Sequence, residues 1–198
     1  MNFSFTDNIC LENNTSLLRP LHSDDAGGLL EAACSDPEMM RFSTAPIHSE
    51  ELLKAYIDDS LKEKRNGLRF PFLIIDKATG KYAGCTSYNN IETDHEKLEI
   101  GWTWLGKPYH RTGLNRSNKF LMLEYAFDHL GCARVEFRTD ERNQRSRTAI
   151  EALGAIYEGT LRHARIGFDG YRKNIVYYSI LKSEWENTVR EHLYRNRT

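Results

Sequence analysis

A glycine turn at residues 110–115 has the residue types of an anion-binding loop. It follows an apolar segment and precedes a helix-like one, and Gly113 lets the backbone approach a ligand closely. The first amides of a helix lack partners within the helix and carry about half a positive charge. Between Gly106 and Lys119 there are four Lys or Arg residues, one His and no acidic residue. This combination predicts a phosphate site; the alternative is an ordinary helix start with basic, solvent-facing side chains.

The elements on either side of this turn are predicted to be a strand and a helix. Between residues 98 and 105, Leu, Ile and Trp alternate with other residues, which is the pattern of a strand with two different faces. After Gly113, apolar residues recur at spacings of three and four up to Leu130, and Gly131 follows as a helix stop. The sequence contains neither a Walker loop nor a three-glycine dinucleotide fingerprint.

A second strand-to-helix unit follows directly. Val135, Phe137 and Thr139 share one face of a short strand, polar residues fill 140–147, and Gly154 closes a short helix. Earlier in the chain, we expect a strand at 15–21, helices at 23–33 and 49–64, and a hairpin of 70–75 with 82–88. A further hairpin is predicted from 156–168 and 172–181. Strands that first meander and then alternate with helices predict an α/β protein with a mixed sheet.

Composition bounds the class of protein. The chain has 198 residues, of which 40% are hydrophobic, and a net charge of −1, which suits one substantial core and argues against nucleic-acid binding. No apolar run approaches the roughly 18 residues that span a bilayer, and no signal peptide is recognisable, so we expect a cytoplasmic protein without membrane contact. The Cys and His residues lack metal-ligand spacing, so no metal site is predicted.

The domain organisation is predicted to be simple. Residues 1–182 are expected to form a single domain, and residues 183–198 a polar C-terminal helix or tail. Ser183 and Glu186 have the spacing of a capping box, but few apolar anchors follow them. We therefore expect a frayed tail or a dimer contact here, and a homodimer is one option for the whole protein.

Three segments in order carry a family resemblance: WLGKPYHRTGLN at 104–115, RTDERNQRS at 138–146 and ALGA at 152–155. Together they resemble the GNAT acetyltransferases, and most closely their ribosomal-protein N-terminal acetyltransferase-like branch. The resemblance implies one mixed, largely antiparallel central sheet flanked by helices. It also implies that acetyl-CoA is the cosubstrate and that the strand ending at Leu105 splays from the strand at Val135.

The same resemblance assigns residues to acetyl-CoA. The pyrophosphate loop corresponds to His110, Arg111, Thr112, Gly113, Leu114 and Asn115. His110 and Asn115 depart from the usual residue types, but backbone amides do most of the binding. The pantetheine arm is expected to pair with the backbone near Trp104 and Leu105. Asn143 and Ser146 match positions near the pantetheine and the sulfur, and on local sequence they fit a helix N-cap and a first-turn serine equally well.

Glu99 is the leading candidate for the general base. Strict alternation places Glu99 on one face with Thr103 and Leu105, opposite Trp102 and Trp104, although a bulge in this strand would reverse the facing. The alternative for Glu99 is an ordinary solvated strand carboxylate.

Two further positions concern proton transfer. His163, in the predicted strand after Gly159, is the alternative base. The family resemblance allows a glutamate two residues further along, but Arg165 stands at that place here. The tyrosine that protonates the thiolate in the family corresponds to Ile150, so Ser146 is the substitute acid.

The expected acceptor is a primary amine of low pKa. At pH 7, deprotonating an α-amine costs roughly 1 kcal/mol, whereas a lysine costs roughly 4.6 kcal/mol. Weak proton-transfer machinery therefore favours a protein or peptide N-terminus attacked directly in a ternary complex. A small-molecule amine, or a catalytically impaired module that only binds acetyl-CoA, are the alternatives.

Overall fold

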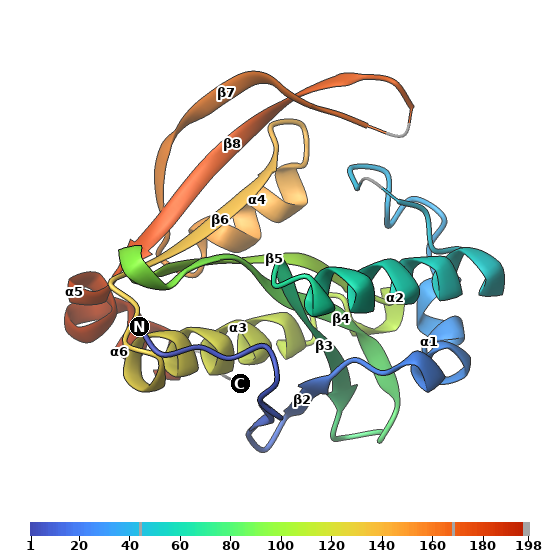
Figure 1. The fold of residues 1–198 in the computed structure, drawn as a ribbon, viewed down its shortest axis with the longest axis horizontal. Coiled ribbons are helices and arrows are strands. Elements are labelled where there is room, and N and C mark those ends of the chain that lie inside the picture. Colours follow the sequence, from blue (N-terminus) through green and yellow to red (C-terminus); the bar gives the residue numbers. More distant parts are fainter. Residues whose placement is uncertain (44, 168, 196–198) are drawn as a thin grey trace.

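The computed structural model describes residues 1–43, 45–167 and 169–195. Its centre is one open sheet of eight strands in the order β1-β2-β3-β4-β5-β6-β8-β7 (Figure 1). Every neighbouring pair is antiparallel except β5 and β6, which are parallel. The strands are β1 (Leu11–Glu12), β2 (Ser16–Pro20), β3 (Arg69–Asp76), β4 (Tyr82–Glu92), β5 (Lys97–Leu105), β6 (Arg134–Asp140), β7 (Ile156–Ile166) and β8 (Arg172–Leu181). The predicted mixed, largely antiparallel sheet is confirmed.

Helices cover both faces of the sheet. The helices are α1 (Ala26–Ala33), α2 (Glu50–Arg65), α3 (Leu114–Glu124), α4 (Gln144–Glu151), α5 (Lys182–Glu184) and α6 (Arg190–Arg195), with π-helical turns at Tyr125–His129 and Trp185–Val189. On one face, Leu29 of α1 and Leu53 of α2 form a core with Trp104 of β5. On the other, Phe120 of α3 and Ile150 of α4 pack with Val135 of β6. We call these the α2 face and the α3 face.

A β-bulge in β5 changes which side chains share a face. Cys85 of β4 pairs with Trp104, but Ser87 pairs with Gly101, so one residue of β4 lies opposite two of β5. Trp102 lies in the bulge with φ +52°. Beyond it the alternation is reversed, because the bulge adds one residue to a period of two.

The strict alternation expected around Glu99 is therefore wrong. Leu98 belongs to the core of the α3 face, so its neighbour Glu99 points to the α2 face, where Trp104 also lies. Thr103 points the opposite way and bonds to Lys119 of α3. Glu99 and Thr103 thus lie on opposite faces of the sheet.

The C-terminal segment is anchored in the core. Trp185, Val189 and Leu193 recur every four residues and are 0%, 5% and 0% exposed. The Trp185 indole donates to Asp128 Oδ1 at 3.0 Å, and its ring stacks on Phe127. The residues form a helix, and the expected scarcity of apolar anchors is wrong. The polar majority of this segment conceals a regular apolar stripe.

Strands β7 and β8 form a long hairpin that arches over the α2 face toward the segment joining α1 and α2 (Figure 1). Lys173 of β8 donates to the carbonyl oxygens of Phe42 and Ser43 in that segment, at 3.0 and 2.8 Å. The Arg142 guanidinium also lies 3.8 Å from the ring centroid of Tyr171 and 5.6 Å from that of Phe42. These contacts tie the hairpin to the helical side.

Candidate active site

The site begins where β5 and β6 separate. Among the described residues, the two strands pair only through Lys97–Arg134, Leu98–Val135 and Glu99–Glu136. Past these pairs β5 continues to Leu105 while β6 pairs with β8 on its other side. We call the space between residues 100–105 and 137–140 the strand gap. The splay that the family resemblance implied is present.

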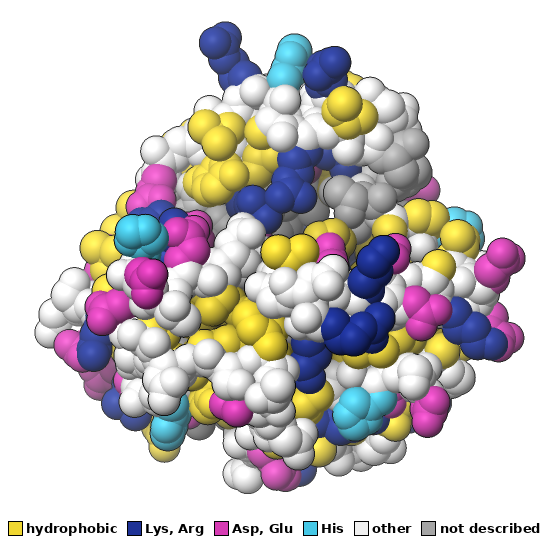
Figure 2. Space-filling model, viewed as in Figure 1, with side chains coloured by type: hydrophobic (Ala, Val, Ile, Leu, Met, Phe, Trp, Pro, Cys, Tyr) yellow, Lys and Arg dark blue, Asp and Glu magenta, His cyan; other side chains and the backbone are white. Residues whose placement is uncertain are grey.

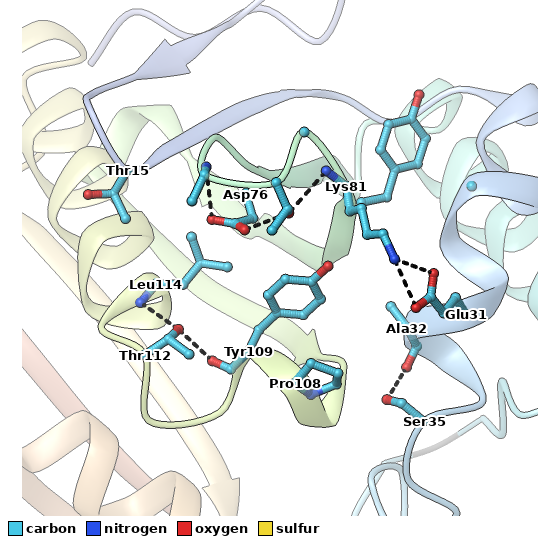
Figure 3. Close-up of a pocket in the computed structure, with 15 residues that line it drawn as sticks. Thr15, Glu31, Ala32, Ser35, Asp76, Lys81, Pro108, Tyr109, Thr112 and Leu114 are labelled. Atoms are coloured by element: carbon cyan, nitrogen blue, oxygen red, sulfur yellow. Dashed lines mark hydrogen bonds and ion pairs between the residues drawn. The ribbon is translucent and has the colours of Figure 1, made fainter.

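The glycine turn lies at the end of β5 and starts α3. Gly113 is the N-cap of α3 with φ +85°, and Arg111 also has a positive φ of +62°. Thr112 Oγ1 donates to the Tyr109 carbonyl at 2.9 Å and accepts from the Leu114 amide at 3.4 Å (Figure 3). Within the described residues, the amides of Thr112, Gly113 and Asn115 have no hydrogen-bond partner. Unpartnered amides at a helix start are the arrangement that the predicted phosphate site requires, and phosphate binding itself stays a prediction.

His110 holds the loop in place. Its Nε2 lies 2.8 Å from the carbonyl oxygen of Leu105, the last residue of β5. The ring is therefore engaged with the strand end. This contact provides a structural role for the residue whose type departs from the family pattern.

A cavity of about 950 Å³ lies beside the loop, between α1 and the β3–β4 turn (Figure 3). Pro108, Tyr109 and Thr112 form one wall, and Lys81 paired with Glu31 lies on another. Neither Glu99 nor Ser146 lines this cavity. No residue of 100–105 or 137–140 lines it either, so this cavity is separate from the strand gap. The candidate site is therefore located by the separation of β5 and β6 and not by this cavity.

Asn143 and Ser146 lie at the start of α4, next to the end of β6. Asn143 is the N-cap, and its Oδ1 accepts from the Ser146 amide at 3.1 Å. This is the structural role that the local sequence allowed. The Asn143 amide NH₂ and the Ser146 hydroxyl have no partner among the described residues, so both keep donors for a ligand.

Glu99 lies at the point where the strands separate. It is 3% exposed, its Oε2 accepts from Asn90 Nδ2 at 2.7 Å, and the same oxygen is 2.9 Å from Arg138 Nε. Burial raises the pKa of Glu99 above its ordinary value, while the Arg138 charge opposes that rise. The carboxylate is thus neither solvated nor isolated.

His163 lies apart from the other candidates. It is exposed on β7, where a register shift between Leu161 and Arg165 accompanies its φ of +51°. Its amide donates to Asn174 Oδ1 at 2.9 Å. In the described part of the chain, His163 contacts neither Glu99 nor Ser146, and Ser146 and Glu99 belong to different faces of the sheet.

Lys119 is a residue whose role the sequence did not indicate. It was counted with the basic residues of the loop, but its side chain points into the core and is 6% exposed. Its Nζ donates to Thr103 Oγ1 at 2.6 Å and to Thr86 Oγ1 at 3.1 Å. Burial lowers the pKa of Lys119 to about 7. The sequence feature that could have indicated this burial is the position of Lys119 on the apolar side of α3.

The α2 face of this region is strongly charged. Figure 2 shows Lys and Arg side chains in a hollow below the β7–β8 hairpin. Arg138 pairs with Glu99 and Arg142 with Asp140, at 2.9 and 2.7 Å. No group of three or more potential metal ligands occurs among the described residues. Across all described residues, no helix is both long and apolar enough to cross a membrane.

Comparison with known proteins decides the family. The model of the acetyltransferase (GNAT) domain matches residues 16–156, which is most of the chain. This protein belongs to the GNAT acetyltransferase family. It is therefore an acyltransferase, and the match includes the splayed strands, the glycine turn and the start of α4.

Individual relatives agree. The chain is 27% identical over 183 residues to "Putative ribosomal N-acetyltransferase YdaF" of Bacillus subtilis (strain 168), covering 89% of this chain and 97% of the relative. It is 26% identical to "Uncharacterized N-acetyltransferase p20" of Bacillus licheniformis, over 85% of this chain and 93% of that protein. A GCN5-related N-acetyltransferase structure from Brucella melitensis superposes with a TM-score of 0.89 at 26% identity, covering 98% of this chain and 88% of that one. The resemblance to the ribosomal acetyltransferase-like branch is thus confirmed.

Proposed function

We propose that this GNAT protein transfers the acetyl group of acetyl-CoA to a protein or peptide N-terminal α-amine, by direct attack in a ternary complex. The observation that carries the proposal is the position of the unpartnered amides at Thr112, Gly113 and Asn115, at the mouth of the strand gap. An anion bound there lies at the end of a groove whose two walls are separate strands. A diphosphate with a long slender arm fits such a site.

The residues around the gap fit acetyl-CoA. The start of α3 would hold the pyrophosphate through the amides of residues 112–115, with His110 fixing the loop to β5. Backbone groups at Trp104 and Leu105 would pair with the pantetheine arm from one wall, and Asn143 Nδ2 and the Ser146 hydroxyl would donate from the other. When bound, acetyl-CoA supplies an activated acetyl group as its thioester.

Glu99 is the proposed proton acceptor. It lies at the base of the gap on the α2 face, whereas the glycine loop opens from the α3 side, so the two reactants would approach from opposite faces. A carboxylate whose pKa is raised by burial accepts a proton better than a solvated one. His163 is the alternative base; its exposure on β7, against the burial of Glu99, favours Glu99.

Contacts that span the α2 face favour an acceptor whose amine lies at the end of a slender chain. Lys173 ties the segment at Phe42 and Ser43 to β8, and Arg142 bridges Phe42 to Tyr171, so contacts span this side. An extended N-terminus fits beneath such a bridge. The ease of deprotonating an α-amine, roughly 1 kcal/mol at pH 7 against roughly 4.6 kcal/mol for lysine, favours the same acceptor.

The test is release of free CoA from acetyl-CoA, followed with a thiol reagent, in the presence of matched acceptors. Three are needed: a peptide with a free N-terminus and no lysine, the same peptide with a blocked N-terminus and one internal lysine, and a small primary amine. Release with the first alone supports the proposal. Release with the small amine alone would support a small-molecule enzyme. Thermal stabilisation by CoA without release for any acceptor would identify a binding module instead.

A further inference from the structure

Three side chains form a hydrogen-bonded triangle beneath the strand gap. Lys119 Nζ lies 2.6 Å from Thr103 Oγ1 and 3.1 Å from Thr86 Oγ1, and the two hydroxyl oxygens are 2.8 Å apart. Lys119 and Thr86 are buried, at 6% and 0% exposure, but Thr103 is exposed. Thr103 therefore connects a buried amine to the surface of the gap.

The buried amine has no counter-charge among the residues that the structure describes. Burial alone lowers the pKa of Lys119 to about 7, and no acidic side chain of the described residues acts on it. From β4, Tyr88 faces the same core, and its hydroxyl donates to the Met122 carbonyl at 2.6 Å. From β5, the residues on this face besides Thr103 are apolar, and the charged neighbour one turn earlier on α3 is Arg116. An uncompensated buried amine costs stability, which calls for a functional reason.

The triangle lies on the side from which acetyl-CoA would enter. Thr103 belongs to the α3 face, as does the glycine turn at the start of α3, and Glu99 belongs to the opposite face. The residue that would carry the family's tyrosine is Ile150, which has no proton to give. Ser146 can donate a hydrogen bond from the other wall, but among the described residues its hydrogen bond is to Asn143, which does not titrate.

We propose that the Thr103 hydroxyl protonates the departing sulfur of CoA, and that Lys119 positions this hydroxyl and replaces its proton. The proposal rests on the proposed function, because it needs a thioester in the strand gap. As the amine nitrogen bonds to the carbonyl carbon and the carbon–sulfur bond breaks, the Thr103 oxygen gives its proton to the sulfur, which keeps the electron pair. In the same step the Lys119 ammonium gives a proton to the Thr103 oxygen and becomes a neutral amine, so no free alkoxide forms. The proton that the acceptor amine loses through Glu99 to solvent balances the one that Lys119 regains from solvent.

The acidity of the buried amine suits this role. A thiol has a pKa of about 8.5 and an exposed lysine about 10.4, so an exposed ammonium is roughly 100 times too weak an acid to protonate a thiolate completely. With its pKa near 7, the Lys119 ammonium is instead the stronger acid. Burial thus turns an ordinary lysine into a proton donor that works near neutral pH.

Kinetic variants separate this role from a structural one. Using the acceptor that the peptide assay identifies, Thr103→Val should lower kcat about 100-fold, with the KM for acetyl-CoA unchanged within about threefold. Thr103→Ser should retain activity. Lys119→Met should lower kcat similarly and abolish the decline of kcat that we expect for the wild type above about pH 7. Lys64→Met is the matched control, because Lys64 is another lysine whose pKa burial lowers, but it lies over Phe70, away from the gap.

A measurement without turnover uses lysine labelled with ¹³C at Cε, with the Lys119 signal assigned from Lys119→Met. With desulfo-CoA bound, Lys119 should titrate in a single step near pH 7. With CoA bound, the titration should split by about one pH unit or more, because two coupled groups share protons. The same single step with both ligands, or a Thr103→Val variant with wild-type kcat, would refute the proposal. If neither ligand raises the melting temperature, the proposed function fails together with it.

Discussion

Replacing Lys119 with methionine should change how the stability of the protein depends on pH. The unfolded chain keeps the Lys119 proton up to about pH 10.5, whereas the folded protein releases it near pH 7 because burial lowers the pKa. Between these values the unfolded state binds one more proton, so the folded wild type gains stability as the pH rises. The methionine variant has no such proton and lacks this gain.

The size of the effect follows from the two pKa values. Each pKa unit corresponds to about 1.4 kcal/mol, so the ionised lysine destabilises the fold by up to about 5 kcal/mol below pH 7. The free energy of unfolding of the wild type, measured relative to Lys119→Met, should therefore rise by about 4 kcal/mol between pH 6 and pH 10. Both hydroxyl bonds to Lys119 are lost at every pH in the variant, so they shift the difference without changing its slope.

The assay is urea unfolding of both proteins at pH 6, 7, 8, 9 and 10. Lys182→Met serves as the control, because the Lys182 side chain is 46% exposed. Subtracting the variant removes the titration of the other groups. Curves for the wild type and Lys119→Met that stay parallel within about 1 kcal/mol would refute the assignment of a buried, easily deprotonated lysine.

Three further outcomes follow from the structure. Gly113→Val should weaken CoA binding about 10- to 100-fold in calorimetry, through loss of one hydrogen bond to a phosphate worth roughly 1.5–3 kcal/mol. Gly131→Val is the control, because Gly131 has a φ of +75° at the far end of the same helix and its replacement should cause similar backbone strain without that loss. Equal CoA affinities for the two variants would argue against the loop assignment. Glu99→Gln should lower kcat by roughly 10²-fold or more and remove the rise of kcat with pH expected for the wild type. The midpoint of that rise should lie above the ordinary glutamate pKa, because burial raises the pKa of Glu99. An unchanged pH profile would exclude Glu99 as the base. Trp185→Ala should destabilise the fold by about 3–5 kcal/mol and lower the melting temperature by roughly 6–20 °C, and a loss below about 1 kcal/mol would contradict the docking of the C-terminal helix.

Much of the site could be predicted because its parts are local in the chain. The positive φ of Gly113 and the unpartnered amides after it come from a turn of a few residues, so the sequence around them is sufficient. The capping bond from Asn143 to the Ser146 amide is equally local. The same holds for the hairpin β7–β8 and for the helix that Gly131 ends. The turn and the capping bond join residues within a few positions, and the hairpin joins two strands that are consecutive in the chain.

The facing of β5 and the environment of Lys119 could not be predicted in this way. The bulge at Trp102 depends on how β5 pairs with β4, and one added residue exchanges the faces of everything beyond it. As a result Glu99 meets Arg138 on one side of the sheet, and Thr103 meets Lys119 on the other. Nothing in the alternation of residues 98–105 marks the position of the extra residue.

The sequence by itself determined the family, the order of the elements and the glycine turn at the start of α3, because backbone conformation and apolar periodicity act over a few residues. Only the tertiary structure decided the surroundings of the titratable side chains. Lys119 meets Thr86 from 33 residues away, and Glu99 meets Arg138 across a parallel strand pair. Burial in the folded protein lowers the pKa of Lys119 and raises that of Glu99, where the Arg138 charge opposes the rise. Acidity depends on the surroundings of a group, and those surroundings exist only after the chain has folded.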